Sequence, residues 1–212
     1  MKRDRADKIH RKLQLAYPEL RDKSYSESPL RALIGGILSQ RTRDENCSRA
    51  TERLFQRIVT VNDILALEQK ELYDLIRCSG FYKQKAAHIQ ASCRKIIDVH
   101  SGSVPSSRRE LMDLPGVGPK TADIVLSYGF GKPAVAVDVH IHRITCRVGY
   151  TSPKAMPEET KIAIEQAHRE QEWQFIDSAF LEHGKKVCKA KKPLCFNCLL
   201  YEECDRVGVI GD

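Results

Sequence analysis

The chain has 212 residues, 42% of them apolar, which is enough to bury one sizeable hydrophobic core or two small ones and argues against a disordered protein. Its formal net charge is +7, from 35 basic and 28 acidic residues. Basic side chains gathered on one face release counterions from a phosphate backbone, so nucleic acid is a natural partner if the excess charge is localised.

The first ten residues are rich in charged side chains. No apolar run in the sequence approaches the roughly 20 residues that cross a membrane. We therefore expect no secretory signal, no membrane partner and an intracellular location, which in a prokaryote would be the cytoplasm or nucleoid. The chain also contains eight cysteines. Because an intracellular compartment keeps thiols reduced, their spacing favours metal binding over a disulfide framework.

Apolar residues recur at helical spacing through most of the chain, which predicts an all-α protein. A helix is expected to begin at Pro29, with Ser28 as its N-cap residue, and to carry an apolar face made of Leu30, Leu33, Ile34, Ile37 and Leu38. A further helix carries Ala50, Leu54, Phe55 and Ile58. One more helix is expected from about Asn62 to about Gly80, and another carries Ala86, Ile89, Cys93, Ile96 and Ile97.

The stretch Leu111–Ala122 reads Leu-Met-Asp-Leu-Pro-Gly-Val-Gly-Pro-Lys-Thr-Ala, with helical patterns on both sides of Pro115–Gly118. Ser107 and Glu110 have capping-box spacing before the first of these helices. Gly116 and Gly118 permit positive φ in a tight hairpin and remove side chains that would keep backbone N–H groups away from a ligand. The second helix then points its N-terminal amides at an anion, which indicates a grip on a DNA phosphate. The alternative is a simple turn between two packed helices.

Residues Val135, Val137 and Val139 alternate as the residues of a half-buried strand would. No second alternating run lies nearby in the sequence to pair with them, and an isolated strand is not stable. We therefore expect no strand between Ala134 and Ile141.

Four cysteines form a C-x6-C-x2-C-x5-C array near the C-terminus: Cys188, Cys195, Cys198 and Cys204. Four thiolates in one short loop indicate a metal, and both zinc and a 4Fe-4S cluster accept tetrahedral sulfur ligation. The other cysteines are interpreted as small buried apolar residues: Cys47, Cys78, Cys93 and Cys146.

The stretch Leu111–Ala122 resembles the helix-hairpin-helix of the endonuclease III family of DNA glycosylases. The resemblance continues through Val-Asp-Val-His-Ile-His-Arg at residues 137–143 and extends in all from about Ser28 to Cys204. It implies an all-α, helix-hairpin-helix DNA glycosylase fold with two helical domains and a cleft between them. Residues 23–130 are expected to form a helical-barrel domain that contains the hairpin, and residues 1–22 and 131–212 an iron-sulfur cluster domain.

The resemblance also implies catalytic residues. In this family the lysine of the Gly-x-Gly-x-Lys-Thr-Ala sequence attacks C1′ of the damaged nucleotide, and the matching residue is Lys120. Because only the neutral amine attacks, we expect a closed pocket and the positive end of the following helix to favour loss of its proton. The family's aspartate falls on Asp138, expected to stabilise positive charge on the sugar and to be separated from Lys120 or engaged as a helix cap. Without the family match, Lys120 would be a phosphate-binding lysine and Asp138 only an N-cap.

Access to C1′ requires the target nucleotide to be flipped out of the stack, and a wedge fills the hole that it leaves. The segment Gly80–Ala86 resembles the family's Gly-Leu-Tyr loop and makes Phe81 the apolar wedge candidate, with core packing as the alternative. The segment Leu38–Asp44 resembles the polar wedge region, in which Gln40 and Arg41 compete for the role. The other residues expected to contact DNA are Pro115, Gly116, Gly118 and His140.

The cysteine array matches the cluster loop of the family, so the resemblance implies a 4Fe-4S cluster with a structural role, redox signalling being the alternative. The implied function is that of a bifunctional glycosylase and abasic-site (AP) lyase of base excision repair, which removes oxidised pyrimidines and cleaves by β-elimination. Its implied partner is double-stranded DNA with damaged bases or abasic sites, and a monomer is expected.

Other functions stay open. Adenine-removing mismatch enzymes need a glutamate in the helix before the wedge, and Leu33–Arg41 contains none. They also usually carry an extra C-terminal domain, whereas this chain ends soon after Cys204. A mismatch uracil or thymine glycosylase is a closer rival, although related monofunctional members lack the lysine found at position 120. A noncatalytic DNA-binding or redox-sensing protein would use the same hairpin and cluster for docking alone.

Overall fold

The computed structural model describes residues 3–21 and 28–209 and divides the chain into two compact units. The central unit is Tyr25–Lys132, and the terminal unit combines Met1–Ser24 with Pro133–Asp212. The expected domain boundary between residues 22 and 23 lies outside the described residues. Within the described ranges every regular element is helical, and no helix there is long and apolar enough to cross a membrane.

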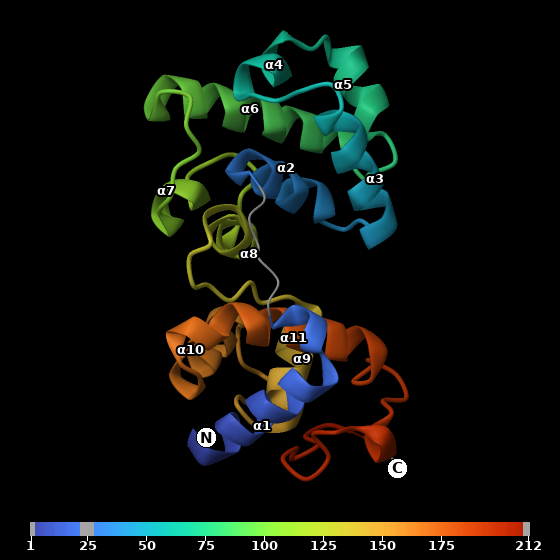
Figure 1. The fold of residues 1–212 in the computed structure, drawn as a ribbon. Coiled ribbons are helices and arrows are strands. Elements are labelled where there is room, and N and C mark those ends of the chain that lie inside the picture. The colour runs from blue at the N-terminus through green and yellow to red at the C-terminus, as the bar shows by residue number, and fades with distance from the viewer. Residues whose placement is uncertain (1–2, 22–27, 210–212) are drawn as a thin grey trace. The chain divides into compact units, whose positions relative to one another are not determined.

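The central unit is a bundle of helices built around α2 (Pro29–Ser39), which packs against helices from both halves of the unit. Figure 1 shows α6 (Tyr82–His100) between α2 on one side and two short helices on the other, α4 (Val61–Ala66) and α5 (Gln69–Ile76). The remaining elements are α3 (Asp44–Phe55), α7 (Arg108–Met112), α8 (Pro119–Ile124) and the π-helical turn η2 (Val125–Gly129) that continues α8.

The helix α2 is the core of this unit because it is apolar almost all round. Its buried residues are Leu30, Ala32, Leu33, Ile34, Gly36, Ile37 and Leu38. Each fully buried Leu or Ile contributes roughly 1.5–3 kcal/mol. At Gly36, an added Cβ would lie 2.7 Å from Thr121 Cγ2, so the missing side chain lets α8 approach α2 closely. The hairpin helix is thereby fixed to the most buried element of the unit.

The terminal unit packs α9 (Val139–Val148) against α10 (Pro157–Ala167) and α11 (Trp173–Lys186). The N-terminal helix α1 (Arg3–Ala16) adds Ile9 and Leu13 to the same core. Three short 3-10 helices complete the unit: η1 (Pro18–Leu20), η3 (Glu170–Glu172) and η4 (Cys195–Asn197). The two ends of the sequence therefore share one core, whose most buried members include Phe180, Ile176 and Ile144.

Helix starts follow the capping chemistry read from the sequence. Ser28 Oγ accepts the N–H of Arg31 at 3.1 Å, as expected. Ser107 Oγ accepts the N–H of Glu110 at 3.3 Å, but the Glu110 carboxylate accepts from the Ser107 hydroxyl and closes no capping box. The prediction of a single helix from about Asn62 to about Gly80 is wrong, because the helix is interrupted at Leu67 and Glu68, between α4 and α5.

The segment 134–138 is extended without forming a strand, as expected. Ala134, Val135 and Ala136 are buried in succession and Val139 is exposed, so the alternating valines do not share one buried face. The N–H of Ala136 donates to Asp177 Oδ1 at 2.7 Å, which satisfies a backbone group that a sheet would otherwise pair.

Candidate functional site

The hairpin between α7 and α8 is a tight turn fixed by its own apolar residues. Leu114 and Val117 are buried, and the N–H of Val117 donates to Leu114 O at 3.1 Å. Gly116 has φ +78°, and an added Cβ would fall 2.7 Å from atoms of the His88 side chain. Both the backbone conformation and the available space therefore require glycine at position 116.

Gly118 differs from the expectation of positive φ. Its φ is −99° and its ψ −179°, an extended conformation that any residue adopts, and it stands at the N-cap of α8. An added Cβ would meet nothing within 4 Å. Space beside the backbone, not an unusual dihedral angle, is therefore what glycine supplies at this position.

The two hairpin helices are clamped together by one ion pair. Arg108 at the start of α7 donates from Nε to Asp123 Oδ1 at 3.0 Å and from Nη2 to Oδ2 at 3.2 Å. Asp123 is buried and lies on α8. A buried carboxylate held by a two-pronged guanidinium fixes the angle between the helices and so the direction of the hairpin.

Lys120 is the second residue of α8, directly after Pro119. Its side chain is exposed. A side chain at the rim of a binding surface loses water only when a ligand covers it. A ligand bound over the hairpin would remove water from a group placed in this way.

Asp138 is half-buried and caps the N-terminus of α9, as expected. Its Oδ1 accepts the N–H of His140 at 2.8 Å and the N–H of Ile141 at 2.9 Å. The two bonds fix the orientation of the carboxylate, because both donors belong to the rigid first turn of the helix.

His140 is held by a residue that the sequence reasoning did not single out. Arg143 donates from Nη2 to His140 Nδ1 at 3.1 Å and to Gly184 O at 2.9 Å, and from Nε to Cys188 O at 2.9 Å. Because arginine only donates, Nδ1 of His140 is the acceptor and the ring proton is on Nε2. Arg143 thus links the start of α9 to the end of α11.

The three wedge candidates are brought together at one edge of the central unit. Phe81 is 60% exposed, which argues against the core-packing alternative. The Arg41 guanidinium carbon lies 5.8 Å from the centroid of the Phe81 ring. Gln40 turns the other way and donates from Nε2 to Gly116 O at 2.8 Å, in the hairpin. The sequence reasoning missed Lys85, which is buried behind these residues.

The four array cysteines follow α11 and are all half-buried free thiols. Cys188, Cys198 and Cys204 pack against the core of the terminal unit. Burial raises the pKa of Cys198 to about 11, and the other three thiols act on it in the same direction as electrostatic neighbours. Within residues 3–21 and 28–209, however, no three Cys, His, Asp or Glu side chains are arranged so that they could hold a metal ion.

Two array thiols are contacted by cationic or imidazole side chains. Arg147 donates from Nη1 to Cys188 Sγ at 3.4 Å. His183 Nε2 lies 3.3 Å from Cys198 Sγ, and its Nδ1 lies 3.0 Å from the Tyr17 hydroxyl oxygen. The donor set is therefore rich in sulfur, and N–H groups are present that would stabilise thiolates.

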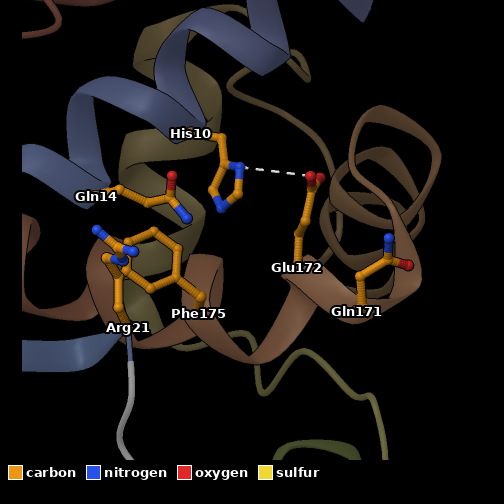
Figure 2. Close-up of a pocket in the computed structure, with 6 residues that line it drawn as sticks. All are labelled: His10, Gln14, Arg21, Gln171, Glu172 and Phe175. Carbon is orange, nitrogen blue, oxygen red and sulfur yellow. Dashed lines mark ion pairs between the residues drawn. The ribbon is translucent and has the colours of Figure 1, made fainter. Parts of the chain in front are cut away.

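A separate pocket of about 280 Å³ lies in the terminal unit, where α1 meets η3 and α11 (Figure 2). His10 Nδ1 faces Glu172 Oε1 at 3.4 Å across it, and burial lowers the pKa of His10 against the opposing effect of the carboxylate. The pocket is lined by His10, Gln14, Arg21, Gln171, Glu172 and Phe175. Since this lining includes neither lysine nor cysteine, it offers none of the nucleophiles that the sequence singled out.

Comparison with known proteins gives the family. Residues 34–170 match the model of the HhH-GPD superfamily base excision DNA repair proteins. The endonuclease III of Thermotoga maritima is 45% identical over 177 residues, which are 84% of this chain and 83% of that protein. A solved structure of a trapped endonuclease III–DNA covalent intermediate aligns with TM-score 0.88 and 32% identity over 97% of both chains.

A thermostable thymine-DNA glycosylase aligns with TM-score 0.85 at 22% identity, over 96% of both chains, which shows a shared fold only. The alignments with the endonuclease III relatives cover most of each relative's length and most of this chain. The all-helical architecture, the glycine hairpin, Lys120 and the cysteine array agree with this assignment. The chain belongs to the endonuclease III family, within the HhH-GPD superfamily of base excision DNA repair proteins.

Proposed function

We propose that this protein excises damaged bases from double-stranded DNA and cleaves the strand at the resulting abasic site, with Lys120 as nucleophile. The observation that carries the proposal is the place of Lys120, in the first turn of the helix that leaves the glycine hairpin, in a chain of the endonuclease III family. A DNA backbone gripped at the hairpin would cover this exposed amine and remove its water.

The proposed chemistry uses one amine for two steps. Lys120 Nζ attacks C1′, the glycosidic bond breaks, and the base leaves with the bonding electrons and gains a proton. Opening of the sugar ring gives a Schiff base between Nζ and C1′. This cation acidifies the C2′ proton, whose loss expels the 3′ phosphate by β-elimination, and water then releases the lysine.

Asp138 is proposed to stabilise positive charge that develops on the sugar as the base departs. Two backbone N–H groups of α9 hold its carboxylate in place, which supports a role that depends on orientation. We further propose that Pro115, Gly116, Gly118 and His140 contact the DNA backbone, and that Gln40, Arg41 and Phe81 occupy the space left by the flipped nucleotide.

The preferred lesions are proposed to be oxidised pyrimidines. The helix α2 contains no glutamate, the residue that the adenine-removing mismatch enzymes need before the wedge. A mismatch thymine or uracil glycosylase is the second candidate, favoured by the shared fold with the thymine-DNA glycosylase. Because the proposed substrate is cellular DNA, the proposal includes an intracellular site of action, and it requires no partner protein.

The four array cysteines are proposed to hold a 4Fe-4S cluster. The chemistry of their donor set supports the proposal, because four thiols lie in one loop and two of them are contacted by Arg147 and His183. When bound, such a cluster would supply cross-links that fix the loop. A purified protein with brown colour, absorbance near 400 nm and about four iron atoms per chain would support this assignment.

Borohydride trapping tests the central proposal. Incubation with a duplex that contains thymine glycol or an abasic site, in the presence of borohydride, should give a covalent protein–DNA adduct because the Schiff base is reduced in place. The adduct should be absent from Lys120→Gln and reduced in Asp138→Asn with damaged-base DNA. A wild-type chain that binds these duplexes without forming adduct would leave only the noncatalytic DNA-binding function.

A further inference from the structure

Lys85 is a buried lysine without a carboxylate partner. It lies in the first turn of α6 and is 4% exposed. Its Nζ donates to Leu38 O at 2.7 Å, to Thr42 Oγ1 at 2.7 Å and to Ser79 Oγ at 2.8 Å. An ammonium group has three protons, so all of its donors are used, and among the described residues the ion pairs include none with Lys85.

The three acceptors come from two segments, the end of α2 with the loop that follows it, and the loop before α6. Leu38 and Thr42 flank Gln40 and Arg41, and Ser79 lies two residues before Phe81. The ammonium group therefore bonds both loops that carry the wedge candidates. Burial lowers the pKa of Lys85, while the nearby Cys47 opposes this effect. A charged residue that costs free energy to bury, and whose three hydrogen bonds all go to groups beside the wedge candidates, is suited to fixing these loops.

The hydroxyl groups around Lys85 complete a network in which every donor has an acceptor. Ser79 donates to Leu38 O at 3.1 Å and accepts from Lys85. Thr42 donates to Gln40 O at 3.2 Å and accepts both from Lys85 and from the N–H of Gly80, the latter at 3.2 Å. A fully satisfied buried network specifies one arrangement of the groups that it joins.

The loop tips in front of this network have backbones that need such support. Arg41 has φ +49° and Phe81 has φ +57°, in the left-handed region that non-glycine residues rarely adopt. The loops press together so closely that a Cβ on Gly80 would lie 3.2 Å from Arg41 O. Two strained residues and an exposed aromatic ring persist only where the surrounding structure holds them.

The network also extends to the hairpin. Gln40 is placed between the two loops and the hairpin, since its Nε2 donates to Gly116 O at 2.8 Å and lies 3.5 Å from Thr121 Oγ1. Thr121 follows Lys120 directly in α8. The wedge candidates and the start of the nucleophile's helix are therefore connected by side-chain hydrogen bonds within the central unit.

We propose that Lys85 is a positioning residue that locks the loops bearing Gln40, Arg41 and Phe81 into one rigid wedge, ready to enter the base stack of duplex DNA. This inference rests on the proposed glycosylase function and adds a residue that touches no DNA itself. The buried ammonium group of Lys85 would thus support base extrusion. A wedge that is already ordered opens the base stack without first paying the entropy of ordering its own loops.

The test compares Lys85→Met with Lys83→Met, an exposed lysine on the same helix that controls for loss of one charge. Extrusion is followed by the fluorescence of 2-aminopurine placed beside the lesion, and excision by single-turnover kinetics. Lys85→Met should lower the rate of both by about tenfold to a hundredfold, since a small misplacement of a working group has effects of this size. Borohydride trapping at a preformed abasic site, which is already unstacked, should change by less than about threefold.

A double-mutant cycle with Phe81→Ala distinguishes a positioning role of Lys85 from a general loss of folding. If Lys85 acts through the wedge, the double variant Lys85→Met/Phe81→Ala should extrude bases no more slowly than Phe81→Ala alone. Thr42→Val removes one acceptor without removing the charge and should give a smaller loss of the same kind, which keeps the test usable if Lys85→Met folds poorly. Lys85→Arg retains the charge and should recover part of the activity.

The inference is overturned if folded Lys85→Met extrudes and excises bases at the rates of Lys83→Met. It is also overturned if the excision rate and the abasic-site trapping of Lys85→Met fall by the same factor, or if the effects of Lys85→Met and Phe81→Ala on the extrusion rate are additive. Failure of the proposed function gives a different result, because the wild-type chain would then form no adduct with any abasic or damaged duplex. That outcome removes both proposals, whereas the preceding ones remove only the role of Lys85.

Discussion

The glycine hairpin of the central unit and the cysteine loop of the terminal unit, residues 187–209, are both short connections, yet they are held in different ways. The hairpin has buried apolar residues on each side of Gly116, Leu114 and Val117. In the cysteine loop only Leu200 and Glu203 are buried. Its backbone is held instead by arginines, such as Arg147, which donates to Lys189 O at 2.7 Å and to Ala190 O at 3.1 Å.

The difference indicates which region would depend on the proposed cluster. Each hydrogen bond adds only about 1 kcal/mol net, whereas burial of a large apolar side chain adds roughly 1.5–3 kcal/mol. A loop of this length with a single buried apolar side chain needs another source of order, which a cluster bonded to four thiolates would provide. The hairpin is specified by apolar packing and by the Arg108–Asp123 ion pair, and should keep its shape without any bound group.

The largest expected effect is that of removing the proposed cluster. In Cys198→Ser or in chelated protein, amide hydrogen exchange in residues 187–209 should accelerate about a thousandfold, while exchange at Val117 stays unchanged. Hydrogen exchange read by mass spectrometry measures both segments at once, with Cys78→Ser as a control thiol in the central unit. Equal acceleration in the hairpin and the loop would contradict the separation of the two regions.

A second difference between the units is their response to acid. His168 in the terminal unit is 3% exposed, and burial lowers its pKa from 6.5 to about 4. Its Nε2 lies 2.8 Å from the Tyr150 hydroxyl oxygen, and His10 and Glu172 are further titratable neighbours. In the central unit neither His88 nor His100 is buried.

Because His168 binds its proton less tightly in the folded chain than in the unfolded one, its contribution to stability is complete above pH 6.5 and is lost as the pH falls toward 4. The loss should reach about 3 kcal/mol and fall on the terminal unit. His168→Gln should remove this part of the pH dependence and leave the part due to His183, whose pKa burial also lowers to about 4. Titration of the His168 ring by NMR checks the cause directly, and a midpoint above pH 6 would show that the histidine is not buried as a neutral ring.

A matched pair of glycine variants tests how the hairpin is fixed. The expected loss of stability is smaller than in the two preceding predictions. Gly116→Ala has to adopt φ +78° and to displace the His88 side chain, so it should lower the free energy of unfolding of the central unit by about 2 kcal/mol. Gly118→Ala meets open space at φ −99° and should change it by less than about 0.5 kcal/mol. Urea unfolding gives both values, and equal losses would show that the two glycines have the same structural role.

The sequence predicted well those features that arise from neighbouring residues. Caps such as Ser28 and Ser107, the helical periodicity of α2 and the Asp138 cap all depend on contacts within four residues. The absence of a strand at residues 134–138 was also predicted, because pairing would have required a second strand. The break between α4 and α5 was missed, since Leu67 and Glu68 include neither glycine nor proline.

The features that the sequence did not predict depend on residues far apart in the chain. Lys85 looks like any helical lysine until the fold places Leu38 and Thr42 beside it. The exposure of Lys120 was not predicted either, because it depends on how the rest of the central unit packs around the first turn of α8. A glycine motif suggested the same role for Gly116 and Gly118, but only the first has positive φ.

The most direct test of the central claim is to identify the residue that becomes bonded to the sugar. Borohydride-reduced adduct is digested with nuclease and protease, and the modified peptide is sequenced by mass spectrometry. The account predicts that the reduced sugar is attached to Nζ of Lys120 and is absent from Lys120→Gln. A modification on Lys83, Lys85 or any other amine at full yield, or an adduct that persists in Lys120→Gln, would contradict it.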